Sequence, residues 1–140
     1  DQYHVRILRI PQEEYHDEDL FDDRLNRFNS LPEFLKNIEK SPFSENIIPI
    51  IGDSVEISRN WEIPLGLLFI DGGHSIEAAK NDFDCWSKHI ISGGLLAIHD
   101  VFPNPEDGGR PPYEIFCIAK QSNSFKEIEL VKSLAVLEKI

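Results

Sequence analysis

The sequence predicts an α/β fold with a mainly parallel sheet that ends in an antiparallel hairpin near its C-terminus. First, two apolar runs, residues 65–70 and 95–98, flank an amphipathic segment at 76–90. Strand, helix and strand at this spacing form a right-handed unit in a parallel sheet. Second, the apolar run at 47–51 ends in a polar turn, which is typical of another buried strand. Third, two alternating segments close the chain as a hairpin.

The N-terminal part predicts a strand, an acidic segment and a helix. Residues 3–10 alternate loosely between apolar and polar side chains, which indicates a strand. Residues 13–23 hold seven acids and no Lys or Arg, which is typical of a solvated loop or a helix start. Ser30 begins a helix, with Pro in the first turn and Glu33 completing a capping box. Its apolar face comprises Leu31, Phe34, Leu35 and Ile38, and Ser41-Pro42 ends it.

The remaining elements follow from apolar periodicity and from Gly and Pro. The helix expected at 76–90 has one apolar seam, made of Ile76, Ala79, Phe83, Trp86 and Ile90. We expect Gly93-Gly94 to break this helix before the strand at 95–98. Residues 103–112, with four prolines and two glycines, predict a rigid loop. A short helix at 113–120 and a hairpin of 127–132 and 134–139 complete the prediction.

Composition excludes several classes of protein. The 140 residues are 41% hydrophobic and 28% charged, which suits one folded domain rather than disorder. Acids outnumber bases by 25 to 14, so the formal net charge of −11 disfavours nucleic acid as a partner. The longest apolar run, residues 65–70, is far shorter than the ~20 residues that cross a membrane. Two cysteines, no CxxC and no signal peptide lead us to expect a cytoplasmic protein.

Polar residues gather where three predicted strands end. These strands run into Gly52-Asp53-Ser54, Asp71-Gly72-Gly73-His74 and His99-Asp100. Ligands of open α/β sheets bind beyond the carboxyl ends of the strands, so we expect these side chains to form one site. Taken singly, each residue is better explained as a cap or an incidental polar residue. Asp71, His99 and Asp100 together indicate a metal site, because paired carboxylates otherwise repel each other.

The motifs around these strand ends resemble a known family. The segments Leu67–His74, Asp82–Trp86 and Gly93–Phe102 resemble the class I S-adenosylmethionine-dependent methyltransferases. Within that class the chain is similar to the family-24 group, related to macrolide sugar O-methyltransferases and cephalosporin-hydroxylase-like proteins. The likeness covers about residues 13–140, including the loop Asp107–Tyr113. It implies a Rossmann-like three-layer sandwich and an enzyme that uses S-adenosylmethionine.

The resemblance also implies roles for individual residues. Asp53 matches the acid that accepts a hydrogen bond from the adenine amino group, with Gly52, Ser54 and Asp71 also at the cofactor. Asp71 and Asp100 match ligands of a divalent metal, and His74 matches the general base that deprotonates the acceptor hydroxyl. Where metal-dependent relatives often carry Glu, this chain has His99, which extends the choice of metal from Mg²⁺ to transition metals.

One part of the family pattern is missing. The family has a glycine-rich turn after its first strand and an acid after its second, and neither occurs before Glu13. The chain also starts at Asp1 and contains no Met. We therefore expect a single methyltransferase-like domain over 1–140 that lacks residues before or around 10–13.

Three functions are compatible with these residues. The leading one is O-methylation of a small hydroxylated molecule, with acceptor loops at 13–30 and 102–113. A metal-dependent hydrolase or oxygenase could use Asp71, His74, His99 and Asp100, but it would leave Asp53 without a role. A non-catalytic relative with an assembly role is the third. The methyl acceptor stays unidentified, no membrane partner is expected, and a homo-oligomer is compatible with the sequence.

Overall fold

The computed structural model describes residues 3–7, 21–22, 27–72 and 75–140. The chain forms two compact units. One combines Asp1–Arg9 with Asp53–Ile140, and the other is Ile10–Gly52.

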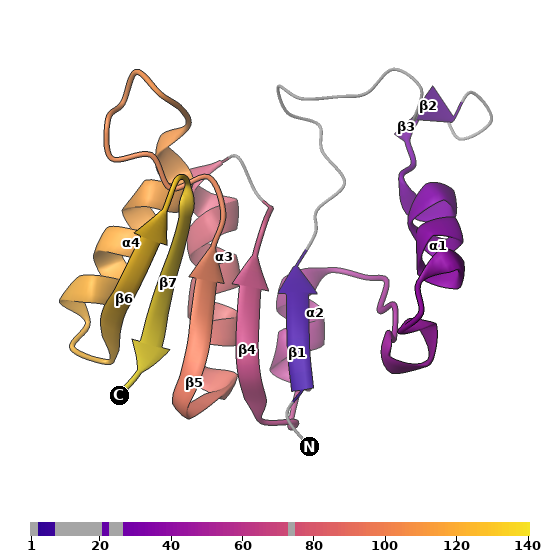
Figure 1. Cartoon of the computed structure of the whole chain (residues 1–140), viewed down its shortest axis with the longest axis horizontal. Coiled ribbons are helices and arrows are strands. Elements are labelled where there is room, and N and C mark those ends of the chain that lie inside the picture. The colour runs from indigo at the N-terminus through magenta and orange to yellow at the C-terminus, as the bar shows by residue number, and fades with distance from the viewer. Residues whose placement is uncertain (1–2, 8–20, 23–26, 73–74) are drawn as a thin grey trace. The chain divides into compact units, whose positions relative to one another are not determined.

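The first unit is built on a five-stranded mixed sheet with the order β1-β4-β5-β7-β6 (Figure 1). The strands are β1 (Tyr3–Ile7), β4 (Leu65–Ile70), β5 (Ile90–Ile98), β6 (Phe125–Val131) and β7 (Leu134–Lys139). β1, β4 and β5 are parallel to one another, while β7 runs antiparallel to both β5 and β6. The α/β class, the parallel strands at residues 65–70 and 95–98, and the closing hairpin are confirmed.

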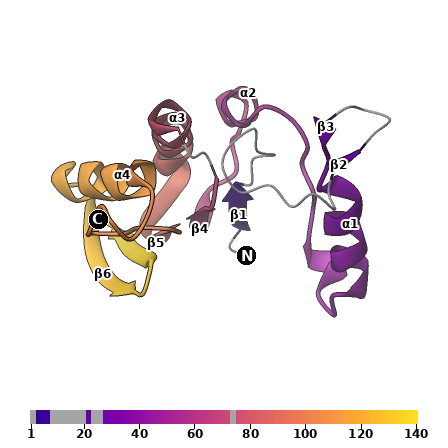
Figure 2. The ribbon, with the colours of Figure 1, turned by 90° about the horizontal axis from the view of Figure 1, so that it is seen from above.

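Three helices of this unit lie on the same side of the sheet (Figure 2). They are α2 (Ser54–Arg59), α3 (Ile76–Trp86) and α4 (Arg110–Gln121). A 3₁₀ turn, η3 (Ser87–His89), connects α3 to β5. Among the described residues, no helix is long and apolar enough to cross a membrane.

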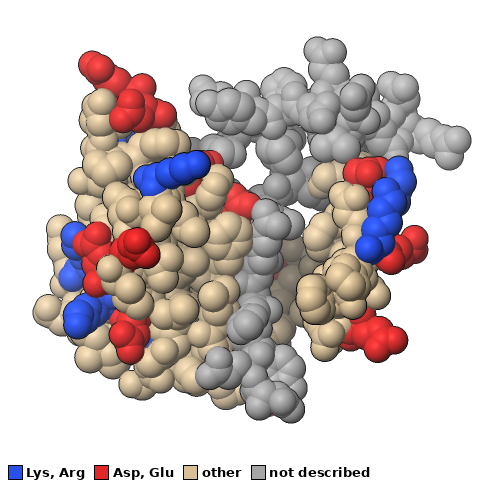
Figure 3. Space-filling view, viewed as in Figure 1, with Lys and Arg blue, Asp and Glu red and all other residues tan. Residues whose placement is uncertain are grey.

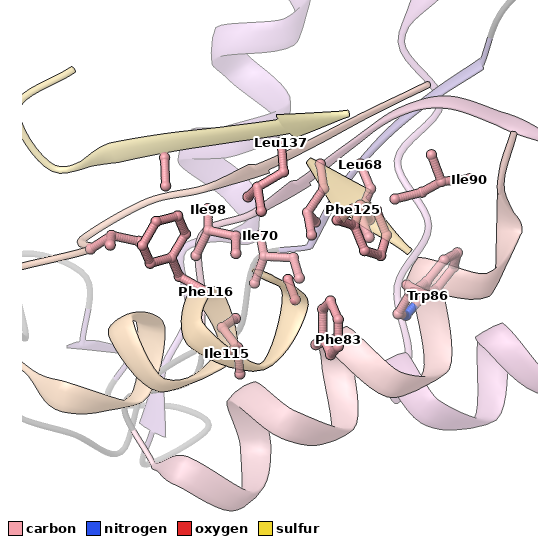
Figure 4. Close-up of a cluster of buried hydrophobic side chains, with 14 of the residues drawn as sticks. Leu68, Ile70, Phe83, Trp86, Ile90, Ile98, Ile115, Phe116, Phe125 and Leu137 are labelled. Carbon is pink, nitrogen blue, oxygen red and sulfur yellow. The ribbon is translucent and has the colours of Figure 1, made fainter. Parts of the chain in front are cut away.

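The core lies between this side of the sheet and α3 and α4 (Figure 4). Strand register places Leu68 beside Leu96 and Leu96 beside Leu137. All three are fully buried, because residues directly opposite on neighbouring strands share one face. Phe83 and Trp86 of α3, with Ile115 and Phe116 of α4, complete this core.

The other face of the sheet is formed by the alternate residues of the same strands. Leu67 of β4 pairs with Leu95 of β5, and Phe69 pairs with Ala97. Figure 3 shows this face, and its surface over β4 and β5 is largely without charged side chains. Over β6, acidic and basic side chains lie next to each other.

The predicted boundary between helix and strand at Gly93-Gly94 is wrong. The helix ends at Trp86, and β5 already begins at Ile90, which is buried opposite Leu65. The register then shifts, so that Leu67 pairs with Leu95. Gly93 and Gly94 lie in the resulting bulge, where Gly93 adopts a φ of 77°. Glycine inside a strand marks such a bulge as well as it marks a helix end.

The C-terminal helix also begins earlier than predicted. α4 starts at Arg110, so residues 110–112 belong to the helix rather than to the loop. Pro111 and Pro112 occupy its first turn, where a missing N–H leaves no helical hydrogen bond unmade.

The second unit contains α1 (Leu31–Lys40), the 3₁₀ turn η2 (Ser44–Asn46) and a short antiparallel pair, β2 (Phe21–Asp22) and β3 (Arg27–Phe28). The helix from residue 31 is confirmed, but its capping box is not formed. Ser30 makes no side-chain capping bond, and the Leu31 N–H donates to Oδ1 of Asn29 at 3.3 Å. Glu33 pairs with Lys36 at 3.3 Å instead. Most of the acidic segment at 13–23 lies outside the described residues.

The predicted strand at 47–51 is wrong. These residues are not part of any strand among the described residues, and Ile48 and Ile51 are 80% and 69% exposed. Pro49 removes one backbone N–H from any ladder that this segment could form. An apolar run becomes a strand only when another strand pairs with it, and local sequence does not carry that information.

Candidate functional site

Three of the predicted site residues meet at the carboxyl ends of β4 and β5. Asp71 directly follows β4, while His99 and Asp100 directly follow β5. The His99 N–H donates to the Ile70 carbonyl at 3.0 Å, which continues the ladder between the strands by one residue. This backbone hydrogen bond confirms the expectation that the polar ends of the two strands lie side by side.

The imidazole of His99 lies between the two carboxylates. Its Nδ1 is 3.2 Å from Oδ1 of Asp71 and 3.1 Å from Oδ1 of Asp100. This nitrogen is buried and makes no hydrogen bond of good geometry to the described residues, although the side chain as a whole is 42% exposed. Phe69 contacts the ring, with its centroid 6.3 Å away. The ring can thus reach solvent or a ligand while one nitrogen faces two acids.

The backbone of Asp100 has a left-handed conformation, with a φ of 58°. This region costs most residues other than glycine about 1–2 kcal/mol, and Asp tolerates it better than most. The conformation is held on both sides. His99 is bound to β4 as described above, and the Val101 N–H donates to the Ser133 carbonyl at 2.8 Å. The chain thereby turns sharply at Asp100, and its carboxylate stays beside His99.

The donor set of Asp71, His99 and Asp100 has the chemistry that a divalent metal takes, but its arrangement does not fit one. Nδ1 of His99 lies within ion-pair distance of both carboxylates, in the place that a shared cation would occupy. Among the described residues, no group of three or more His, Cys, Asp or Glu side chains could hold a metal as they lie.

Asp53 does not follow a strand, contrary to the prediction. It is the N-cap of α2, and its Oδ1 accepts from the Glu56 N–H at 3.0 Å. A carboxylate can accept several hydrogen bonds, so Oδ2 stays available to another donor. Gly52 is the last residue of the other unit. Asp53 and Ser54 therefore form a candidate ligand-binding turn at the start of a helix.

Two residues that make hydrogen bonds to α2 were not predicted from the sequence to have a role near the site. Trp86 of α3 donates from Nε1 to Oγ of Ser54 at 2.8 Å. Nε2 of His89 lies 3.2 Å from the Ser58 carbonyl, and burial lowers the pKa of this imidazole, aided by Lys88 and opposed by the bond to Ser58. A buried indole needs a hydrogen-bond partner for its N–H, and this rule is the one feature of the sequence that could have pointed to a polar contact of Trp86.

The loop that follows Asp100 is tied to the start of α4. Nη1 of Arg110 donates to the Phe102 carbonyl at 3.0 Å, and its guanidinium lies 4.3 Å from the ring centre of Tyr113. These contacts fix both ends of the segment that was predicted as an acceptor loop. The other predicted acceptor loop, residues 13–30, lies largely outside the described residues, as does His74.

The mixed sheet has three parallel strands, with acids and a histidine at the ends of β4 and β5, and α/β proteins of this class bind ligands at that edge. Comparison with known families identifies it further. A family described as "Methyltransferase domain" matches residues 7–101. This span is more than half of the chain, so the chain belongs to this family, and the resemblance seen in the sequence is confirmed.

The fold resembles that of a solved structure. The fibrillarin pre-rRNA processing protein of Methanococcus jannaschii is 18% identical, with a TM-score of 0.51, and the match covers 85% of this chain and 53% of that one. MycE methyltransferase from the mycinamycin biosynthetic pathway, in complex with Mg and SAH, is 21% identical, with a TM-score of 0.47. That match covers 64% of this chain and 31% of MycE. The chain thus spans about a third to a half of these relatives.

Proposed function

We propose that the intact protein containing this chain transfers a methyl group from S-adenosylmethionine to a hydroxyl of a small molecule. The observation that carries the proposal is the meeting of Asp71, His99 and Asp100 beyond β4 and β5, in a chain of the methyltransferase domain family. This edge of an α/β sheet is where such proteins bind their ligands.

The proposal assigns Asp53 to the cofactor. Its Oδ1 is used to cap α2, and Oδ2 accepts from the adenine amino group. Ser54 contributes the rest of that turn, and Asp71 is placed at the far end of the cofactor, where β4 ends. The expected result is binding in calorimetry with S-adenosylhomocysteine, weakened by Asp53→Ala. Absence of binding by the intact protein overturns the proposal in favour of a non-catalytic relative.

The proposed chemistry is a single in-line displacement. The acceptor oxygen attacks the sulfonium methyl, a carbon–oxygen bond forms, the carbon–sulfur bond breaks, and S-adenosylhomocysteine leaves. The hydroxyl proton passes to His74, which the family resemblance makes the general base. We expect His74→Ala to lower the single-turnover rate by about 10²–10⁴-fold while S-adenosylhomocysteine binding is kept. An unchanged rate would exclude His74 as the base.

A divalent metal held by Asp71, His99 and Asp100 is a separate part of the proposal. It requires the imidazole to turn out from between the carboxylates, and no step of the reaction is assigned to the metal. Its test is the metal content of the purified protein together with the rate after chelation. Loss of activity on chelation that Mg²⁺ or a transition metal restores supports the metal, and an unaffected rate removes it.

A further inference from the structure

We propose that Trp86 is a positioning residue for the cofactor: its indole N–H holds Ser54 and so fixes the turn that carries Asp53. The inference rests on the proposed function, which places Asp53 at the adenine. Trp86 is 3% exposed and lies in α3, 32 residues along the chain from Ser54. The bond from Nε1 to Oγ of Ser54 is 2.8 Å long. It is thus a direct link between the core and the proposed adenine site.

The helix that carries Asp53 depends on such links. α2 has 6 residues, and isolated helices of this length do not form in water. Its first residue, Ser54, is held by Trp86, and its fifth residue, Ser58, is held through its carbonyl by His89. Because a carbonyl only accepts, Nε2 of His89 is the donor. The segment from Trp86 to His89 therefore fixes α2 near both of its ends.

The orientation of the Asp53 carboxylate follows from the position of this first turn. Oδ1 of Asp53 is bound to the Glu56 N–H at 3.0 Å, so the carboxylate turns with the helix start. A shift of Ser54 would move Oδ2 away from an adenine amino group. Trp86 does not touch the cofactor in this arrangement and acts only through Ser54.

Trp61 provides a matched control in the same aromatic cluster. Its ring packs edge-on against Trp86, with centroids 5.3 Å apart. Its indole N–H donates to the Ile63 carbonyl only two residues away. Trp61→Phe therefore removes an indole N–H beside Trp86 without removing a bond to α2, whereas Trp86→Phe and Ser54→Ala each remove the bond to α2.

The test measures how well the intact protein distinguishes S-adenosylhomocysteine from S-inosylhomocysteine, in which an oxo group replaces the adenine amino group. A hydrogen bond to a carboxylate should make the first ligand bind about tenfold more tightly. We expect this ratio to fall to within about threefold in Trp86→Phe, Ser54→Ala and Asp53→Ala, and to persist in Trp61→Phe. The double variant Trp86→Phe/Ser54→Ala should show the same affinity ratio as either single variant, because both substitutions remove the same hydrogen bond. General damage to the fold would weaken both ligands equally and leave the ratio unchanged.

Each outcome decides between the two proposals. A ratio lost in Asp53→Ala but kept in Trp86→Phe overturns the positioning role and leaves the proposed function intact. Binding of both ligands with equal affinity by the unaltered protein overturns the role of Asp53, and the role of Trp86 with it. Amide hydrogen exchange of Val55–Ser58 tests the same link without a cofactor. We expect the exchange rate to rise in Trp86→Phe but not in Trp61→Phe. Equal exchange in the two variants would show that the bond to Ser54 does not hold α2.

Discussion

The geometry of the bulge in β5 predicts that substitutions of two neighbouring glycines lower the free energy of unfolding by very different amounts. A Cβ placed on Gly94 would lie 2.8 Å from Cγ2 of Ile90, 2.9 Å from the Ile91 carbonyl oxygen and 3.2 Å from the Gly66 carbonyl oxygen. Two of these atoms are backbone, and Gly66 belongs to the neighbouring strand β4. Gly94→Ala therefore requires the bulge of β5 to open around Ile91, with a smaller displacement of Gly66 in β4.

The structure sets the size of this effect. Overpacking of a buried site costs about 1–3 kcal/mol, and backbone atoms that cannot rotate away place Gly94→Ala at about 2–3 kcal/mol. The neighbouring Gly93 has open space around its missing Cβ but a φ of 77°. In Gly93→Ala, the left-handed backbone conformation destabilises the folded state by about 1–2 kcal/mol. Alanine also makes the unfolded chain less flexible, which offsets about 0.4–1 kcal/mol of that loss. Gly93→Ala should thus cost about 1 kcal/mol.

Urea unfolding of the intact protein, with its variants, measures the difference. Gly94→Ala should lower the free energy of unfolding about twice as much as Gly93→Ala, and should lower Tm by about 3 °C for each kcal/mol. Gly93→Asn is the matched control, because Asn adopts positive φ readily and should recover most of the loss. Equal costs at the two positions, or a milder effect at Gly94, would refute the close contacts around Gly94 in this bulge.

Three further predictions concern the core, a histidine and the turn at the site. Leu96→Ala should lower the free energy of unfolding by about 2–5 kcal/mol in urea, since Leu96 is fully buried, and a loss under about 1 kcal/mol would contradict that position. The lowered pKa of His89 means that below its ordinary value of 6.5 the unfolded chain takes up a proton more readily than the folded one. Tm should therefore fall as pH drops below about 6.5, and less so in His89→Asn; parallel curves would contradict this. Asp100→Ala should destabilise by about 1 kcal/mol more than Asp100→Asn, because Asn tolerates the φ of 58°; equal Tm values would count against that strain.

The strands that carry the central site could be predicted because their signal is local. Residues 65–70 and 95–98 are apolar runs ending in polar residues, as buried parallel strands do, and the convergence of Asp71 with His99 and Asp100 follows from adjacent strand ends. Residues 47–51 have a similar apolar pattern but no strand partner among the described residues. Whether a partner exists is a property of the whole fold, so the pattern alone led to a wrong strand.

Long-range hydrogen bonds could not be predicted from the sequence for the same reason. The spacing of Trp86 correctly placed it on the buried face of a helix, but its bond to Ser54 joins residues far apart in the chain. Likewise, Gly93-Gly94 indicated a break, and only the register against Leu65 shows that the break lies inside a strand. Local patterns predicted which residues are buried more reliably than which polar atoms they meet.

The place of β7 in the sheet affects the order in which the protein can fold during translation. β5 has β4 on one side and β7 on the other, yet β7 is made about 40 residues later in the chain. While the ribosome is still synthesising α4 and β6, one edge of β5 carries unpaired backbone groups. This edge could pair with a β5 strand of another nascent chain, which is a known route to aggregation. The delayed emergence of β7 therefore leaves this edge of β5 exposed in the newly made protein.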